Sequence, residues 1–425
     1  MEVWRKNLYV LWGTQFLAMA GMNLVVPFLP FYIRHLGISD PDALARWSGL
    51  VFAGPFFLSF LTTPVWGAMG DRYGRKIMIV RAIFGLAISQ VLIGFAQDVY
   101  QLFVFRIVQG AISGFIAAAL AMVSTNTPRE KMGYALGFLQ SSSAAGTVLG
   151  PFFGGVLADL IGYREIFFVT ATLCAIGGVV VITMVRETTA LERPSARYGV
   201  LENYRLMMSD HRLRIVAFAL VVSQMSVLMV EPLFPLFVEG FVTDTRYIST
   251  LAGTIVSISG FFMVISAPWW GKRNDRAGYG RNLWISTVAV GLAYAGHLLM
   301  ADLVQLSFLR AFLGFVRGGV LPALYALVSL YAPADRRGGM MAIASSLTIL
   351  GNMLGPVLGG MVAGQFGITG AFILNSALLL AMGGILRRYL EPDVPARPTL
   401  EGPKAASAAP PLPDPRQTDS QQVLP

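Results

Sequence analysis

The chain has 425 residues, of which 55% are hydrophobic and 13% are charged, and its mean hydropathy is +0.63. A soluble protein needs more polar surface than this composition supplies, so the sequence predicts an all-α protein embedded in lipid. Basic loops and anionic lipid explain the net charge of +9, which leaves no role for nucleic acid.

Apolar runs of about 20 residues, enough to cross about 30 Å of hydrocarbon, recur along the whole chain. The first half contains runs at 8–33, 46–67, 77–97, 101–124, 134–159 and 165–185. The second half contains runs at 213–238, 248–270, 282–301, 304–328, 338–364 and 368–386. The sequence therefore predicts about twelve transmembrane helices in two groups of equal size.

Polar segments divide the chain into an N-terminal bundle at 1–186, a linker at 187–212, a C-terminal bundle at 213–388 and a tail at 389–425. The tail is rich in Pro, Ala and Ser and cannot bury a core, so we expect it to be disordered. Lys and Arg gather on one side of the predicted helices, and basic loops stay in the cytoplasm. We therefore expect a multi-pass protein with both termini in the cytoplasm.

The two halves repeat at an offset of about 204 residues. The matched segments are Gly67-x-x-x-Asp71-Arg72-x-Gly74 with Gly271-x-x-x-Asp275-Arg276-x-Gly278, Arg106-x-x-x-Gly110 with Arg310-x-x-x-Gly314, LGPFFGG at 149–155 with LGPVLGG at 354–360, and Pro27-x-x-Pro30 with Pro232-x-x-Pro235. Repeated bundles of this kind carry a site at their interface near the midplane.

The stretch GAMGDRYGRK at 67–76 is the polar connection between the second and third apolar runs. Its simplest interpretation is a tight turn with positive-inside charges. The repeat suggests a second interpretation, in which the carboxylates at the matching positions Asp71 and Asp275 make a specific interaction. A carboxylate at the membrane edge can pair with basic side chains or with a helix N-terminus. An interaction made in only one conformation biases a two-state equilibrium.

These motifs resemble the major facilitator superfamily, and in particular its twelve-helix drug:proton antiporters, over residues 5–390. The resemblance implies that the polar stretch is a conformational latch of the outward-facing state. The latch residues are Gly67, Asp71, Arg72, Gly74, Arg75 and Lys76, with Asp275 and Arg276 in the second copy. The second copy departs from the pattern by one extra residue before Arg281.

The fifth predicted helix carries the pattern G-x-x-x-G-P-x-x-G-G, which marks antiporters in that family. Its residues are Gly146, Gly150, Pro151, Gly154 and Gly155. The alternative is close helix packing through small residues, which does not depend on function.

Glu231, Arg106 and Arg310 lie inside predicted spans, where an unpaired charge is costly. Arg106 begins an R-x-x-Q-G motif, for which the resemblance implies a part in proton transfer, and Arg310 is its repeat mate. A structural arginine that bonds backbone carbonyls is the alternative. Glu231 is the favoured proton carrier because burial disfavours a charged carboxylate, and a static ion pair is its alternative.

Candidates for cargo binding also lie within the predicted spans, where contact with neighbouring helices is the alternative to contact with cargo. They are Asn23, Arg317, Gln224, Met225 and Phe31. The sequence has no P-loop and no cluster of metal-ligating residues, so we expect no cofactor and no metal, and the proton gradient as the energy source.

The sequence therefore predicts a secondary active exporter, and not an enzyme, that moves drug-like or amphipathic molecules across a bacterial inner membrane by proton antiport. Its partners are a small-molecule substrate, protons and membrane lipid, and the family's usual state is a monomer. The alternative is a dedicated efflux carrier for one metabolite, such as a sugar, a siderophore or an organic anion anchored by Arg317. A membrane-embedded sensor or enzyme would need an extra ordered domain, which neither linker nor tail supplies.

Overall fold

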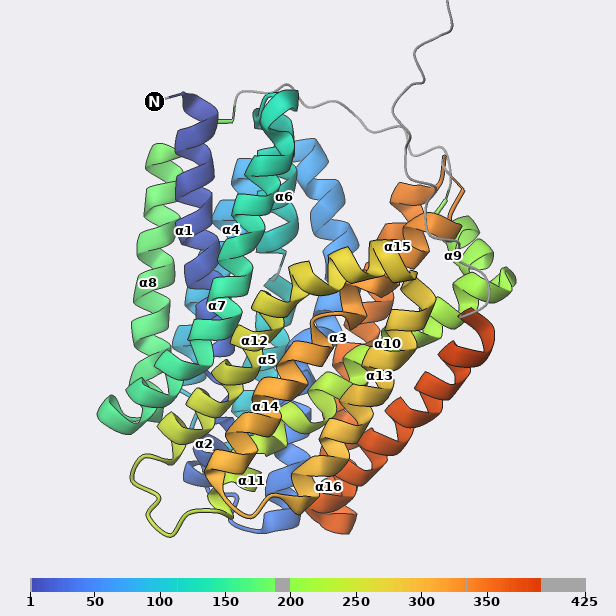
Figure 1. Ribbon diagram of the computed structural model, residues 1–425. Coiled ribbons are helices and arrows are strands. Elements are labelled where there is room, and N and C mark those ends of the chain that lie inside the picture. Colours follow the sequence, from blue (N-terminus) through green and yellow to red (C-terminus); the bar gives the residue numbers. More distant parts are fainter. Residues whose placement is uncertain (1, 113, 188–198, 334, 391–425) are drawn as a thin grey trace, which may run out of the picture.

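The computed structural model describes residues 2–112, 114–187, 199–333 and 335–390, and every regular element in these ranges is a helix (Figure 1). The N-terminal bundle contains α1 (Val3–Asn23), α2 (Leu29–His35), α3 (Pro41–Tyr73), α4 (Arg75–Gly94), α5 (Val99–Ile112), α6 (Phe115–Asn126), η1 (Arg129–Lys131), α7 (Met132–Ile161) and α8 (Tyr163–Met184). The short helix α9 (Val200–Ser209) follows in the linker. The C-terminal bundle contains α10 (His211–Val230), η2 (Glu231–Leu233), α11 (Phe234–Glu239), α12 (Ile248–Ala277), α13 (Tyr279–Gly296), η3 (His297–Leu299), α14 (Leu303–Arg317), α15 (Val320–Tyr331) and α16 (Arg337–Leu390).

The predicted all-α membrane fold is confirmed. In the described ranges, 10 helices are long and apolar enough to cross a membrane. One of them, α16, contains two crossings, because Gly367 adopts a positive φ of 74° and reverses the chain. A further helix, α1, packs along α7 and α8 and completes the N-terminal bundle. The predicted tail lies outside the described residues from position 391 onward.

Four of the predicted spans contain a break in the regular α-helix. The runs at 8–33 and 213–238 break where the matched Pro-x-x-Pro segments remove backbone donors. The run at 101–124 breaks at Gly114, whose φ of 118° is favoured only for glycine, and the run at 304–328 breaks at Gly318 and Gly319. The helix breaks therefore lie at matching positions in the two halves of the chain.

The polar stretch at 67–76 is mostly helix, and the tight turn within it is a single residue. Helix α3 continues to Tyr73, and a single residue, Gly74, with a φ of 100° makes the turn into α4. Glu187 accepts hydrogen bonds from the first backbone N–H groups of α4, at Arg75 (2.9 Å) and Lys76 (3.2 Å). A carboxylate at a helix N-terminus is a favourable partner for these donors, so the first residue of the linker stabilises the turn.

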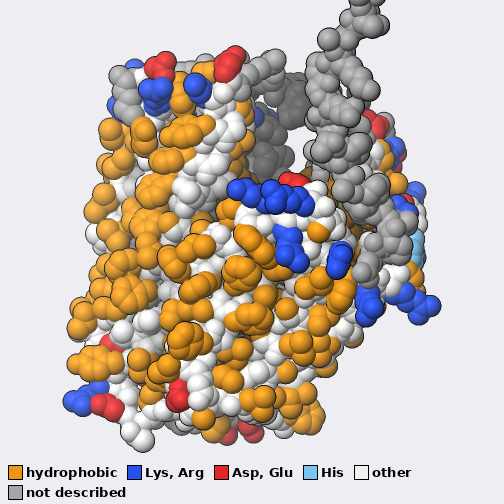
Figure 2. All heavy atoms as spheres, viewed as in Figure 1, with side chains coloured by type: hydrophobic (Ala, Val, Ile, Leu, Met, Phe, Trp, Pro, Cys, Tyr) orange, Lys and Arg blue, Asp and Glu red, His pale blue; other side chains and the backbone are white. Residues whose placement is uncertain are grey.

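The two bundles contact each other near one face of the molecule, which we call the sealed face. There α3 packs against α16, and α7 packs against α12. The other face carries the N-terminus, and we call it the N-terminal face. Figure 2 shows an apolar belt around the molecule and most of the visible Lys and Arg side chains on the N-terminal face.

Candidate transport site

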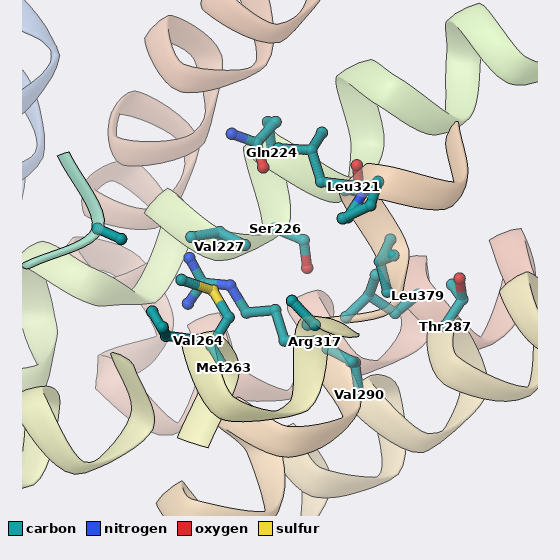
Figure 3. A pocket seen from close by; sticks show the side chains of 16 residues that line it. Gln224, Ser226, Val227, Met263, Val264, Thr287, Val290, Arg317, Leu321 and Leu379 are labelled. Carbon is teal, nitrogen blue, oxygen red and sulfur yellow. The ribbon is translucent and has the colours of Figure 1, made fainter. Parts of the chain in front are cut away.

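Two cavities lie beside the bundle interface, one in each half. The C-cavity has a volume of about 380 Å³ and is formed by helices of the C-terminal bundle with Ala144 of α7 (Figure 3). The N-cavity has a volume of about 390 Å³ and is formed by helices of the N-terminal bundle with Ser345 and Ile349 of α16. Because each cavity takes residues from the opposite bundle, a rocking motion of the bundles changes both walls.

The cavities are related by the internal repeat. Met19, Ser59 and Leu86 line the N-cavity, and the residues at their matching places, Ser223, Met263 and Val290, line the C-cavity. Each cavity also includes a helix break, at Gly114 in one and at Gly318 in the other. The sequence repeat did not reveal these cavities, because the helix breaks that form part of their walls were not predicted.

Arg317 is the one charged residue among the described residues that line the C-cavity. It is the last residue of α14, and Figure 3 shows its guanidinium extending toward Val227 and Met263. No hydrogen bond or ion pair to Arg317 is found within the described part of the chain. The C-cavity therefore combines an apolar wall with a positive charge that has no protein counter-ion there.

The other predicted cargo residues divide between the C-cavity and the helix packing. Gln224 lines the C-cavity and donates a hydrogen bond to Asn352 (3.3 Å). Met225 is buried against glycines of α16, and Asn23 donates to the backbone oxygen of Met19 (2.8 Å). Phe31 is buried near the sealed face, where Arg34 lies over its ring. Of these four, the structure brings only Gln224 together with Arg317.

Glu231 and Arg310 lie together at the break between α10 and α11. The Arg310 side chain is 1% exposed, its Nη1 lies 3.8 Å from Glu231 Oε2, and its guanidinium lies 3.4 Å from the centre of the Phe234 ring. The Nε and Nη2 atoms of Arg310 have no hydrogen-bond partner among the described residues. Because Glu231 is 14% exposed, this carboxylate lies between a buried cation and space that water can reach.

Arg106 has different partners from its repeat mate. Its Nη1 donates to Gln109 Oε1 (2.8 Å) and its Nε donates to the backbone oxygen of Val51 (3.4 Å). Both partners are neutral, whereas Arg310 faces a carboxylate. Arg106 thus has the geometry of the structural alternative, and its predicted part in proton transfer has no acidic partner in the described structure.

The glycines of the antiporter motif serve two different contacts. Side-chain carbons at Gly146, Gly150 and Gly154 would collide with α1 or with Leu24, just beyond its end, inside the same bundle. A side-chain carbon at Gly155 would overlap the backbone oxygen of Ser249 in α12 of the opposite bundle. Pro151 supplies the matching contact, because its backbone oxygen packs against Gly253. The motif therefore closes the sealed face as well as packing one bundle.

Polar contacts join the bundles at the sealed face. Arg34 donates two hydrogen bonds to the Glu239 carboxylate (2.7 and 2.9 Å), and Asp159 accepts from the backbone and hydroxyl of Thr250 (2.8 and 2.7 Å). Sequence reasoning missed both pairs. Arg34 and Glu239 each lie four residues after the second proline of the matched Pro-x-x-Pro segments, so opposite charges at matching places were the available signal.

The described latch residues make no hydrogen bond or ion pair across the bundles. Lys76 donates to Ile182 and Arg75 donates to Ala121, both within the N-terminal bundle, and Asp275 accepts from Tyr279. Arg72 and Arg276 are exposed, and the surroundings of Gly67 and of the Asp71 side chain lie outside the described set. The latch stays a prediction, for a state in which the N-terminal face is closed.

We expect Arg34→Ala to open the sealed face more often. Partly exposed ion pairs contribute about 1 kcal/mol or less, which corresponds to a shift of up to about fivefold in the ratio of the two states. The measurement is the labelling rate of Ala45→Cys, at the sealed face, by a membrane-impermeant maleimide. The exposed pair Asp244 and Arg246 lies within one loop and supplies the control, Asp244→Ala, which should leave the rate unchanged. Equal labelling of Arg34→Ala and wild type would contradict a role for this pair.

Comparison with known proteins agrees with this architecture. The family model for the Major Facilitator Superfamily matches residues 11–304 and 216–418. The multidrug resistance protein MdtG of Proteus mirabilis is 34% identical over 88% of this chain and 94% of its own length. MdtG of Salmonella typhimurium is 33% identical over 89% of this chain and 93% of its own length. A bacterial homologue of the human lysosomal transporter Spinster, in an inward-facing and occupied conformation, shares the fold with a TM-score of 0.74 and 16% identity, over 91% of this chain and 98% of that one.

Proposed function

The chain belongs to the major facilitator superfamily, and we propose that it exports drug-like or amphipathic small molecules across a bacterial inner membrane in exchange for protons. It is a multi-pass membrane transporter and not an enzyme. The observation that carries the proposal is the pair of apolar cavities beside the bundle interface, with Glu231 and Arg310 at a helix break in the bundle that holds the C-cavity. The curated relatives named for multidrug resistance support the class of cargo.

The N-terminal face is then cytoplasmic, because it carries most of the basic loops. In that orientation the state described is closed toward the outside, and cargo enters the cavities from the cytoplasm or the inner leaflet. The energy source is the proton gradient, without a cofactor or a metal. The transporter works as a monomer in lipid, as each chain contains both bundles and both cavities.

Proton coupling works through the charge of Glu231. While the carboxylate is ionised it faces Arg310, and protonation removes that attraction. The proton and the cargo then favour different arrangements of the two bundles, which is the requirement for exchange. Protonation from outside and release to the cytoplasm let the gradient drive the cycle in the direction of export.

The proposal is tested with purified protein in liposomes that enclose a pH-sensitive dye. With an imposed proton gradient, addition of an amphipathic substrate should release protons across the membrane at a rate above that of protein-free liposomes. A panel of cationic, neutral and anionic compounds covers the possible cargo. Transport of any of these compounds without proton movement would contradict proton antiport and would indicate facilitated diffusion.

A second candidate function, efflux of one organic anion, is favoured by Arg317. The described lining of the C-cavity contains this guanidinium and no carboxylate, so an anionic group would find a counter-ion there and a cationic one would be repelled. We expect anionic members of the panel to be transported best, and Arg317→Gln to reduce their transport about tenfold while sparing neutral compounds. Preferential transport of cations would exclude this candidate.

A further inference from the structure

Gln109 in the N-cavity has an amide group that the proposed proton pathway does not use. The cavity wall is apolar apart from hydroxyl groups and this amide, and none of its described lining residues is charged. Two of the three hydroxyls in the lining have backbone partners, because Ser59 donates to Gly110 (3.1 Å) and Thr63 donates to Ser59 (2.6 Å), and the third belongs to Ser345, which is exposed. Gln109 is therefore the buried polar side chain of this lining that has an unused hydrogen-bond donor.

Arg106 fixes the direction of that amide. A guanidinium has only donors, so the Gln109 atom that lies 2.8 Å from Arg106 Nη1 must be the carbonyl oxygen, Oε1. The amide nitrogen, Nε2, then points the other way. Gln109 is 4% exposed, and Nε2 has no hydrogen-bond partner in the described structure.

A buried N–H group without an acceptor costs about 1–3 kcal/mol, and this cost is recovered when an acceptor arrives. We propose that Gln109 Nε2 is the hydrogen-bond donor of a cargo subsite in the N-cavity, which takes an uncharged acceptor such as a carbonyl or ether oxygen on an apolar body. Arg106 is the positioning residue, because it holds the amide in this orientation.

The C-cavity shows why the subsite belongs to one half only. The repeat places Leu313 at the position that matches Gln109, so the second half has no equivalent amide. The C-cavity instead has Arg317. The two cavities thus offer different chemistry, a neutral donor in one and a positive charge in the other.

The subsite rests on the proposed function in one respect, which is that cargo occupies the N-cavity. Its test is binding to the purified full-length protein in detergent, with no gradient, after subtraction of protein-free micelles. The probes are the uncharged fluorescent ketone Prodan and the analogue in which a propyl group replaces the propionyl group. Gln109→Glu keeps an oxygen toward Arg106 and removes the amide donor.

We expect Gln109→Glu to raise the Kd for Prodan about tenfold and to leave the Kd for the propyl analogue unchanged. The emission of bound Prodan should also shift to the blue, because its carbonyl loses a hydrogen bond. Arg106→Lys, which still donates to Oε1, should retain the affinity for Prodan, and Arg106→Met should lose it. The control is Gln101→Glu, on the exposed first turn of α5, which should change neither Kd.

Equal binding of the two probes by wild type, or equal weakening of both by Gln109→Glu, would overturn the subsite. The outcome is independent of proton coupling. A protein that prefers the ketone and moves no protons keeps the subsite and loses antiport, whereas one that exchanges protons for cargo and ignores the ketone keeps antiport and loses the subsite.

Discussion

Glu231→Gln should abolish proton-coupled exchange and leave the protein folded. Glutamine keeps the shape of the side chain and an oxygen acceptor toward Arg310, so the buried guanidinium retains a polar neighbour. It cannot change charge, and so it cannot link proton binding to the position of the bundles. Substrate-triggered proton release in dye-loaded liposomes should fall to the level of protein-free liposomes.

The matched control is Glu239→Gln, which changes a second carboxylate of the same bundle at the sealed face. That variant should retain proton release, with only the small shift between states expected for Arg34→Ala. If Glu231→Gln exchanged protons at the wild-type rate and with the same pH dependence, Glu231 would be a static partner of Arg310.

Gly155→Val should stop transport by preventing closure of the sealed face. A side chain at this position overlaps the Ser249 backbone oxygen of the opposite bundle, and a backbone atom cannot move aside as a flexible side chain can. Overpacking of this kind costs about 1–3 kcal/mol, which favours the open arrangement by about fivefold to a hundredfold. We expect cargo exchange to fall at least tenfold and Ala45→Cys labelling to become fast.

Gly137→Val, on the same helix, is the control, because no atom lies within 4 Å of a side-chain carbon at that position. Gly154→Val separates closure from folding, since it collides with Leu24 of its own bundle and should lower expression and thermal stability instead. Slow labelling of Gly155→Val together with normal exchange would show that the bundles close through other contacts.

The internal repeat made the fold predictable from the sequence. The length of the apolar runs predicted the transmembrane helices, and the matched segments predicted two equivalent bundles. Both signals depend on local composition and on residue order. The helix breaks were missed at Gly114 and at Gly318, since glycine within an apolar run is also compatible with a continuous helix. These breaks form part of the cavity walls, so the cavities were missed with them.

The candidate site was predictable in its residue types and not in its pairings. A charged residue in an apolar run is conspicuous, which is why Glu231, Arg310 and Arg317 could be selected. Their partners depend on helix rotation and on which helices are neighbours. The repeat gave Arg106 and Arg310 the same position, yet one faces an amide and the other a carboxylate. Phe31 was selected for its type, and burial near the sealed face separates it from both cavities.

The glycine contacts of the sealed face have an electrical consequence. Gly155 lies against the backbone of Ser249 and Gly253 against that of Pro151, so the bundles meet there without space for water or ions. We call these contacts the glycine layer. Where water reaches the cavities from the N-terminal face, it extends the electrical potential of that compartment toward the cavities. The membrane voltage then drops mainly across the glycine layer. Moving one elementary charge through that layer is worth about 2.3 kcal/mol per 100 mV. Exchange of a proton for an uncharged cargo would therefore be driven by voltage as well as by the pH difference, and the voltage would act at the step that opens the glycine layer.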